Sequence, residues 1–147
     1  MDKNFKKEVS ARPGGENINY CYSCGTCTAT CPISELDRSY NPRLIIKKVL
    51  LGMKEEVLKS DDLWKCIQCH RCVAHCPQNV KFADIMRVLR EMSCEAGYYP
   101  ESLLQEINEL DKSVRNYRLD LVKKHLNGGK RLEQAITGLA GGDEEDG

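Results

Sequence analysis

Apolar residues recur every three or four positions over most of the chain, which is the spacing of amphipathic α-helices. Asn41-Pro42 supply a capping side chain and a first-turn proline, and they predict a helix over about residues 42–58. A second apolar pattern predicts a helix over about residues 82–96, ended by Gly97. The expected fold class is therefore all-α, mainly helical.

The longest apolar pattern lies near the C-terminus and predicts a helix from Pro100 to about Leu126. Its apolar residues alternate steps of four and three, as in a coiled coil: Leu103, Ile107, Leu110, Val114, Tyr117 and Leu121. A helix of that length is about 39 Å long, more than a small domain covers. We expect part of it to dock on another protein; the alternative is that it folds back on its own domain.

Weaker signals cover the remaining segments. Arg12-Pro13-Gly14-Gly15 is rich in turn residues and makes a short hairpin in residues 1–20 possible. Ser60-Asp61-Asp62 is a helix-cap signal that predicts a short helix leading into Cys66. The expected division is an N-terminal extension (1–20), a cysteine-rich helical domain (21–98), a C-terminal helical docking segment (99–140) with a short helix at 130–139, and an acidic disordered tail (141–147).

Composition excludes several classes of protein. The 147 residues hold 22 Lys plus Arg and 22 Asp plus Glu, so the formal net charge is zero and nothing indicates nucleic-acid binding. The longest strongly apolar stretch, residues 44–51, is interrupted by two lysines and is far shorter than the ~20 residues of a membrane span. No stretch resembles a signal peptide, and we expect a cytoplasmic protein with reduced thiols.

Eight of the nine cysteines form two copies of the pattern Cys-x2-Cys-x2-Cys-x3-Cys-Pro. The first run is Cys21, Cys24, Cys27 and Cys31, and the second is Cys66, Cys69, Cys72 and Cys76. This is the spacing of bacterial two-cluster ferredoxins, where the fourth cysteine of each run binds the cluster of the other run. We therefore expect two [4Fe-4S] clusters, one held by Cys21, Cys24, Cys27 and Cys76 and the other by Cys66, Cys69, Cys72 and Cys31.

Other interpretations of the cysteines fit less well. Structural zinc needs four ligands in two pairs, whereas each run here supplies four with a proline after the last. Cys66-Ile67-Gln68-Cys69-His70 matches a c-type haem attachment site, but that interpretation leaves Cys72 and Cys76 unexplained. Cys94 stands apart on a predicted helix, where burial as a small apolar side chain is the simplest expectation and a redox role the alternative.

The segments around the cysteines are predicted to be helical, which favours the α-helical ferredoxin fold over the strand-paired bacterial one. Three stretches resemble the C subunit of heterodisulfide reductase: residues 21–32, the opening of the spacer helix at Asn41-Pro42-Arg43, and residues 64–69. The resemblance covers roughly residues 15–100. Iron–sulfur subunits of succinate dehydrogenase and fumarate reductase share the motif pair, but they carry a [2Fe-2S] domain ahead of it, for which only 20 residues are present here.

The resemblance implies an electron-relay protein with no catalytic residue of its own. C subunits of this kind pass electrons through two [4Fe-4S] clusters from a flavin-containing A subunit to a cysteine-rich B subunit. The B subunit reduces the mixed disulfide of coenzyme M and coenzyme B in methanogenesis, and a hydrogenase or formate dehydrogenase module can take part indirectly. The alternatives are a free-standing two-cluster ferredoxin and a relay subunit of a related sulfur-metabolism or dehydrogenase complex.

The charges near the two runs differ, and this suggests an order of cluster potentials. Lys65, His70, Arg71 and His75 surround the second run, whereas threonines surround the first. Since nearby cations favour the more negative, reduced state of a cluster, we expect the cluster of Cys66, Cys69, Cys72 and Cys31 to have the higher potential. The alternative is that these charges are solvated or paired.

Overall fold

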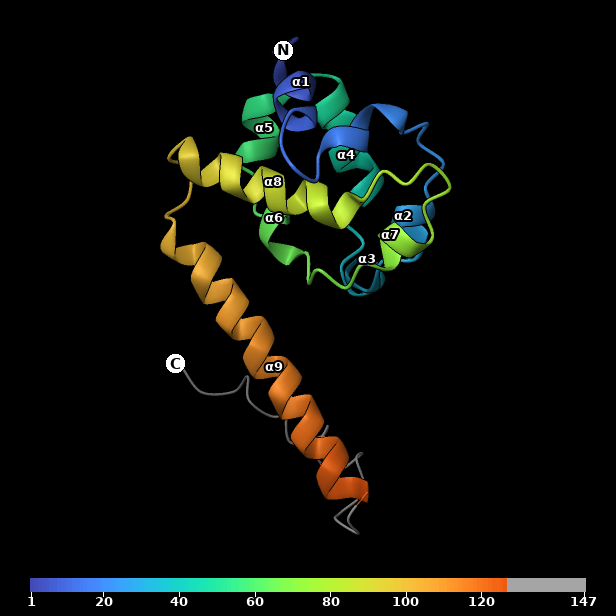
Figure 1. The fold of residues 1–147 in the computed structure, drawn as a ribbon, viewed down its shortest axis with the longest axis vertical. Coiled ribbons are helices and arrows are strands. Elements are labelled where there is room, and N and C mark those ends of the chain that lie inside the picture. Colours follow the sequence, from blue (N-terminus) through green and yellow to red (C-terminus); the bar gives the residue numbers. More distant parts are fainter. Residues whose placement is uncertain (127–147) are drawn as a thin grey trace. The chain divides into compact units, whose positions relative to one another are not determined.

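The computed structural model describes residues 1–126, and every regular element in them is a helix, as Figure 1 shows. The elements are α1 (Phe5–Ser10), the 3₁₀ helix η1 (Glu16–Tyr20), α2 (Thr26–Ala29), α3 (Pro32–Leu36), α4 (Pro42–Leu50), α5 (Lys54–Leu58), α6 (Asp62–Lys65), α7 (Arg71–Ala74), α8 (Phe82–Glu95) and α9 (Ser102–Leu126). The all-α expectation is confirmed. The expected short helix at 130–139 and the acidic tail lie outside the described residues.

The chain divides into two compact units, residues 1–105 and 106–147, so α9 begins in the first and continues in the second. In the first unit, α8 is the longest helix and packs against α1, α5, α6 and α7 (Figure 1). Its apolar side chains Ile85, Met86 and Leu89 are fully buried in the hydrophobic core. The predicted helix over 82–96 is therefore confirmed, and Gly97 follows it with a φ of +76°.

The possible hairpin in residues 1–20 is wrong, because α1 and η1 occupy this segment. Phe5, Val9 and Ile18 are fully buried in the core, so these residues form part of the first unit and are not appended to it. The turn between the helices is tight, since a Cβ on Gly15 would lie 2.0 Å from the carbonyl oxygen of Val9. Because α1 packs against both α4 and α8, the N-terminal segment closes one side of the core.

The single helix predicted over 42–58 is also wrong, because the chain turns at residues 51–53 and separates α4 from α5. Gly52 has a φ of +76°, and its carbonyl oxygen accepts a hydrogen bond from the backbone N–H of Asp2 (2.7 Å). A Cβ on Gly52 would lie 2.2 Å from the carbonyl oxygen of Asp2. The break thus lets the N-terminal segment approach the backbone closely. The predicted start of the helix is confirmed, since the Asn41 side chain accepts a hydrogen bond from the Leu44 N–H.

We expect Gly52→Ala to destabilise the protein more than Gly97→Ala does. Both glycines have a φ of +76°, so left-handed backbone strain is common to the two variants. Gly97 has open space where a Cβ would lie, whereas the Cβ at residue 52 meets the backbone of Asp2. This clash should add about 1–3 kcal/mol. Anaerobic urea unfolding of the cluster-loaded protein measures the difference, and equal midpoints for the two variants would contradict the close approach of Asp2.

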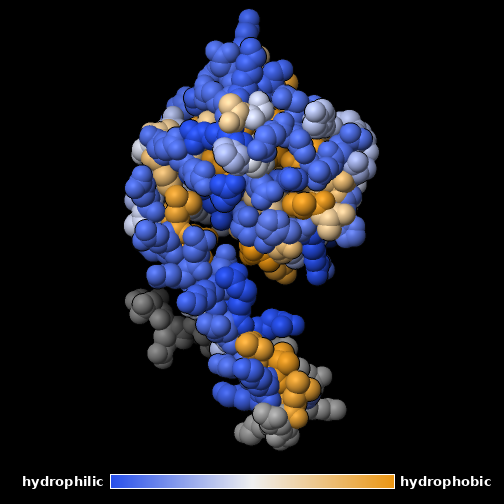
Figure 2. All heavy atoms as spheres, viewed as in Figure 1, coloured by the Kyte–Doolittle hydropathy of each residue, from blue (hydrophilic) through white to orange (hydrophobic). Residues whose placement is uncertain are grey.

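The helix α9 confirms the predicted long C-terminal helix through Leu126, and none of its side chains is buried. Leu110, Val114 and Leu119 are about half exposed. Figure 2 shows apolar side chains gathered on one side of the C-terminal half of α9. No helix within residues 1–126 is both long and apolar enough to cross a membrane.

Candidate iron–sulfur site

The two cysteine runs have the same local backbone structure. Each begins with a cysteine that directly follows a short helix: Cys21 after η1, with φ/ψ of −68°/117°, and Cys66 after α6, with −68°/119°. Two residues later the chain takes a positive φ, at Ser23 and at Gln68. A further positive φ then begins the next short helix, at Gly25 before α2 and at His70 before α7. The doubled motif is therefore also a doubled structure.

Three of these turn positions hold a residue other than glycine, namely Ser23, Gln68 and His70. Left-handed backbone at such residues is uncommon and costs free energy, and it is concentrated at functional sites. The turns point successive cysteines of a run toward a common space. His70 is an exposed residue that directly precedes α7.

The helices α2 and α7 pack against each other, and this brings the two runs together. One hollow, the first cavity, is lined by Cys21, Cys24, Cys27, Cys76 and Cys72, together with Val80, Phe82 and Ile46. A second hollow, the second cavity, is lined by Cys31, Cys66, Cys69 and Cys72, together with Tyr40, Phe82 and Ala83. The fourth cysteine of each run thus lies with the first three of the other run. All nine cysteines are free thiols.

Cys72 and Phe82 line both cavities, so the two spaces adjoin inside the first unit. Cys72 is buried, whereas Cys24 in the first cavity and Cys69 in the second are exposed. Phe82 and Ala83 are the residues of α8 that line the cavities, and the rest of its apolar side packs into the core. Only the first turn of α8 therefore reaches the two cavities.

The chain leaves the two cysteine runs differently after Pro32 and after Pro77. Cys31 is extended, with φ/ψ of −81°/120°, as expected of a residue before proline. Pro32 then begins α3 at the first helical position, a helix that the sequence analysis did not predict. In the second run the Val80 N–H lies 3.4 Å from Cys76 Sγ and donates to it. The segment after Pro77 thus turns back over its own cysteine before α8 begins.

The arrangement of the cysteines fits a four-iron cluster better than a single metal ion. Burial raises the pKa of the Cys27 and Cys66 thiols, and it raises the pKa of Cys72 to about 12. Cubane iron binds thiolates, so it would have to displace these protons on binding. Within the described residues, no three His, Cys, Asp or Glu side chains converge closely enough to hold a single metal ion. Each cavity instead gathers its cysteines around a space.

Polar groups at the sulfurs differ between the two cavities. In the first, Thr26 Oγ1 lies 3.3 Å from Cys24 Sγ, and this hydroxyl lowers the pKa of the Cys24 thiol. In the second, Gln68 Nε2 lies 3.7 Å from Cys66 Sγ. The phenol of Tyr40 also faces the second cavity, where burial and the neighbouring sulfurs of Cys66 and Cys31 raise its pKa well above the usual range. Sequence reasoning missed Tyr40, because only tertiary packing brings it to these cysteines.

Arg90 of α8 is a second residue that sequence reasoning missed. Its side chain is buried and donates hydrogen bonds to the backbone carbonyls of Leu63 (2.6 Å), Trp64 (3.4 Å) and Cys66 (2.6 Å). Two of these carbonyls lie on α6, whose four residues leave their C-terminal C=O groups without helical partners. The guanidinium also lies 5.5 Å from the centroid of the Trp64 ring. Arg90 therefore fixes the end of α6, where the second run begins.

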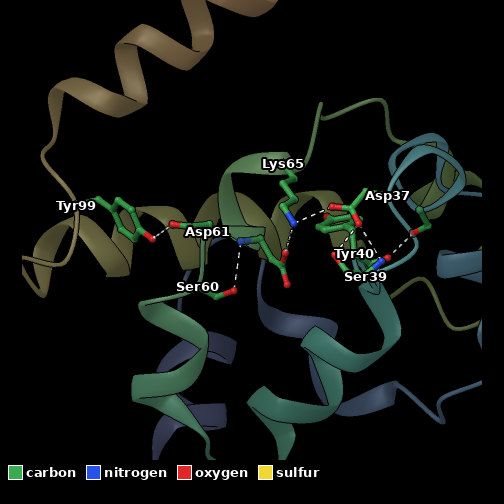
Figure 3. A network of polar contacts seen from close by, with 9 residues as sticks. Asp37, Ser39, Tyr40, Ser60, Asp61, Lys65 and Tyr99 are labelled. Carbon is green, nitrogen blue, oxygen red and sulfur yellow. Dashed lines mark hydrogen bonds and ion pairs between the residues drawn. The ribbon is translucent and has the colours of Figure 1, made fainter. Parts of the chain in front are cut away.

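Lys65 lies in a polar network beside the second cavity (Figure 3). Its ammonium is 2.9 Å from Asp37 and 2.9 Å from Asp62, so its charge is paired and is not free to act on a cluster. Lys65 is one of the four residues on which the expected order of cluster potentials rests, and its pairing weakens that argument. The order itself stays a prediction. Hydrogen bonds from Ser39 and Lys65 hold the pKa of Asp37 well below its usual range. The resulting stabilisation is complete above the usual Asp range and is lost on acidification below it.

Cys94 is buried on α8, and its Sγ lies 3.6 Å from the Pro100 carbonyl oxygen, to which the thiol donates. Burial raises the pKa of this thiol. Neither cavity includes Cys94 among its lining residues. The expectation that it serves as a small buried side chain therefore agrees with its surroundings.

Comparison with known proteins agrees with this geometry. Residues 17–80 match the family model of the 4Fe-4S dicluster domain. The chain is 38% identical over 98 residues to the C subunit of the H(2):CoB-CoM heterodisulfide,ferredoxin reductase of Methanothermobacter marburgensis, a match that covers 67% of this chain and 52% of the relative. It is 44% identical over 82 residues to the iron-sulfur C subunit of the CoB--CoM heterodisulfide reductase of Methanopyrus kandleri, covering 56% of this chain and 42% of the relative.

A third relative is the iron-sulfur C 2 subunit of the CoB--CoM heterodisulfide reductase of Methanocaldococcus jannaschii, 43% identical over 104 residues, covering 66% of this chain and 55% of the relative. The chain spans about half the length of these curated relatives. Residues 17–80, which the family model matches, contain both cysteine runs. The match of residues 17–80 to the 4Fe-4S dicluster domain implies two [4Fe-4S] clusters and an electron-transfer role, and the chain is similar to the iron–sulfur C subunits of heterodisulfide reductases.

Proposed function

We propose that this chain is an electron-relay subunit of a heterodisulfide reductase-type complex. In this role Cys21, Cys24, Cys27 and Cys76 hold one [4Fe-4S] cluster, and Cys66, Cys69, Cys72 and Cys31 hold the other. The cavity linings support this crossed assignment, since each of the two sets lines one cavity. The clusters accept and release single electrons, and the chain positions them and insulates them from water.

The observation that carries the proposal is the arrangement of the two cavities. They adjoin at the buried Cys72, while each has one exposed cysteine, Cys24 or Cys69. An electron could therefore enter at one exposed end, cross between clusters inside the protein, and leave at the other. A relay between two partner proteins needs two such ends.

The partners proposed are a flavin-containing A subunit as electron donor and a cysteine-rich B subunit as acceptor. The names of the relatives support this choice, because they describe C subunits of enzymes that act on the CoB-CoM heterodisulfide. The proposed final reaction is reduction of that disulfide, with two electrons and two protons giving the thiols of coenzyme M and coenzyme B. One relative is named as an H(2)/formate enzyme, which supports indirect coupling to a hydrogenase or formate dehydrogenase module.

The helix α9 supplies a docking surface in this proposal. Leu110, Val114 and Tyr117 are about half exposed on it and follow one another at steps of four and three, so they share one side of the helix, which suits a partner's groove or helix. The surfaces beside the exposed cysteines supply the contacts for electron exchange. Tyr22 is 59% exposed beside Cys24, and Ile67 is 44% exposed between Cys66 and Cys69.

Anaerobic purification and rapid mixing test the proposal together. The chain should carry a C-terminal tag, because residues near its N-terminus pack against Gly52. We expect a flavoprotein and a second cysteine-rich protein to co-purify with it. After reduction, adding the purified cysteine-rich partner and the CoB-CoM disulfide should reoxidise the clusters. A lone monomer with no partner, whose clusters the disulfide system leaves reduced, would contradict the relay.

Charge substitutions at the two exposed ends sharpen the same experiment. Tyr22→Glu and Ile67→Glu should each slow exchange with a different partner, one impairing reduction by the flavoprotein and the other impairing reoxidation by the cysteine-rich protein. Leu36→Glu is the matched control, because Leu36 is 85% exposed and lines neither cavity. If both end variants slowed the same step, the two-ended path would be wrong.

A further inference from the structure

The phenol oxygen of Tyr40 is a buried polar atom that makes no well-formed hydrogen bond within residues 1–126. Tyr40 is 1% exposed, and the sulfur of the proposed ligand Cys66 is the acceptor that neighbours its hydroxyl. Leaving a hydroxyl in this condition is costly, and such groups in folded proteins usually indicate an acceptor that protein atoms do not provide. The position of this oxygen therefore calls for an acceptor beside it.

Tyr40 lines the second cavity together with Cys31, Cys66, Cys69 and Cys72. The sulfide and thiolate sulfurs of a [4Fe-4S] cluster in that space are hydrogen-bond acceptors, and a phenol keeps its proton at neutral pH. The indole Nε1 of Trp64 is the other buried group without a partner in residues 1–126, but Trp64 does not line either cavity. Tyr40 is therefore the group that a cluster would satisfy.

The backbone around Tyr40 is fixed to the segment that carries Cys66 (Figure 3). The Tyr40 N–H donates to the Asp37 carbonyl (3.1 Å), and the Tyr40 carbonyl accepts from Ser34 Oγ (2.9 Å). The Asp37 carboxylate is in turn bound by Lys65 Nζ at 2.9 Å, and Lys65 directly precedes Cys66. The network thus holds the phenol and the first cysteine of the second run at a set separation, so that little ordering is needed when a cluster binds.

The first cavity has a different polar neighbour. Its Cys24 sulfur lies beside the hydroxyl of Thr26, on the more exposed side of the site. A hydrogen bond from a buried group acts in a lower effective dielectric than one at the surface, and so has the larger influence on charge. Since a reduced cluster carries one more negative charge, a donor to its sulfurs favours reduction.

We propose that the Tyr40 hydroxyl donates a hydrogen bond to a sulfur of the cluster in the second cavity and thereby raises the reduction potential of that cluster. This inference rests on the proposed ligand sets. The hydrogen bond would make the second cluster the better electron acceptor, and this effect does not depend on the paired charge of Lys65. The donor acts on the cluster's potential and is not a ligand.

The test compares Tyr40→Phe with Thr26→Val and Tyr99→Phe in the cluster-loaded chain, by EPR-monitored redox titration. Tyr40→Phe removes one oxygen and keeps the ring. It should make reduction of one cluster roughly three- to tenfold less favourable at equilibrium and leave the other unchanged. Thr26→Val should shift the other couple. Tyr99→Phe also removes a bonded hydroxyl, which donates to the Asp61 carboxylate and lies 3.0 Å from the Lys59 carbonyl oxygen, away from both cavities, and it should shift neither couple.

The outcomes separate this inference from the ligand assignment. Suppose that wild type and Tyr40→Phe both bind about eight irons per chain and that the potentials of both clusters are the same in the two proteins. The proposed hydrogen bond would then be wrong, and the proposed ligand sets would stand. The same holds if Tyr40→Phe and Thr26→Val moved one and the same couple. Wild-type iron far below that value would overturn the ligand sets. Pulsed EPR of the wild type in D₂O gives a check without any variant: an exchangeable deuteron should couple to the second cluster, and its absence overturns the donor.

Discussion

The Cys31→Ala variant is expected to lose the cluster of the second cysteine run and to keep that of the first. Cys31 belongs to the first run in sequence, but it lines the second cavity with Cys66, Cys69 and Cys72. Iron should fall from about eight to about four per chain, and one of the two redox couples should disappear. A three-iron species replacing the second cluster counts as the same result, because the altered site is still the second one.

Matched cysteine variants decide which cluster is lost. Cys69→Ala removes a ligand of the second cavity and should leave the same surviving couple as Cys31→Ala. Cys24→Ala removes a ligand of the first cavity and should leave the other couple. Cys94→Ala is the control, because this thiol lines neither cavity and should retain about eight irons. If Cys31→Ala matched Cys24→Ala in its surviving couple, each run would hold its own cluster and the crossed assignment would be wrong.

The second large effect is expected for Arg90→Met. Methionine fills much of the same space but cannot donate to the carbonyls of Leu63, Trp64 and Cys66. Each buried carbonyl left without a donor costs about 1–3 kcal/mol, so we expect a total loss of about 3 kcal/mol. With the m-values usual for small proteins, about 1–3 kcal/mol per M of urea, this corresponds to a urea midpoint roughly 1–3 M lower. Absorbance of the clusters and far-ultraviolet circular dichroism, both under anaerobic conditions, follow the transition.

Arg87→Met is the control on the same helix. Arg87 is exposed, forms an ion pair with Glu91 at 2.8 Å, and donates to the Pro13 carbonyl at 2.8 Å. Exposed pairs of this kind contribute about 0–1 kcal/mol, so this variant should change the midpoint little. Equal midpoints for Arg87→Met and Arg90→Met would mean that water replaces the Arg90 contacts. In the expected case, the redox couple of the second cluster should be the first lost, since Arg90 holds the carbonyl of Cys66.

Local signals in the sequence predicted the elements whose causes are local. Asn41 caps α4 through its own side chain, and Gly97 follows α8 with the left-handed φ that commonly ends a helix. The single helix predicted over residues 42–58 runs through Gly52, because a lone glycine in an apolar helical pattern is usually tolerated; this one breaks the helix through its contact with Asp2, which no local signal shows. The N-terminal turn was likewise read as a hairpin, although its flanking residues pack as helices against α4 and α8.

The candidate site divides in the same way. The cysteine spacing carries the chemistry in the sequence itself, because a cubane needs four thiolates in a short run. Tyr40 and Arg90 have no comparable signal: an aromatic residue before Asn-Pro and an arginine in an amphipathic helix have many ordinary uses. Their roles depend on which carbonyls and sulfurs the folded chain brings beside them. Lys65 differs from Tyr40 and Arg90, because the sequence already indicates a role for its charge. Its pairing with Asp37 and Asp62, which limits that role, appears only in the fold.

The exchange of fourth cysteines between the two cavities also bears on how the protein is made. Under the proposed ligand sets, a growing chain completes the donors of the second cluster only at Cys72 and those of the first only at Cys76, four residues later. The ligand set that contains the first three cysteines of the first run is therefore complete only after most of the domain has been synthesised. Neither cluster can be finished on an N-terminal fragment, and the delivery of iron and sulfide is confined to a chain that already contains both runs.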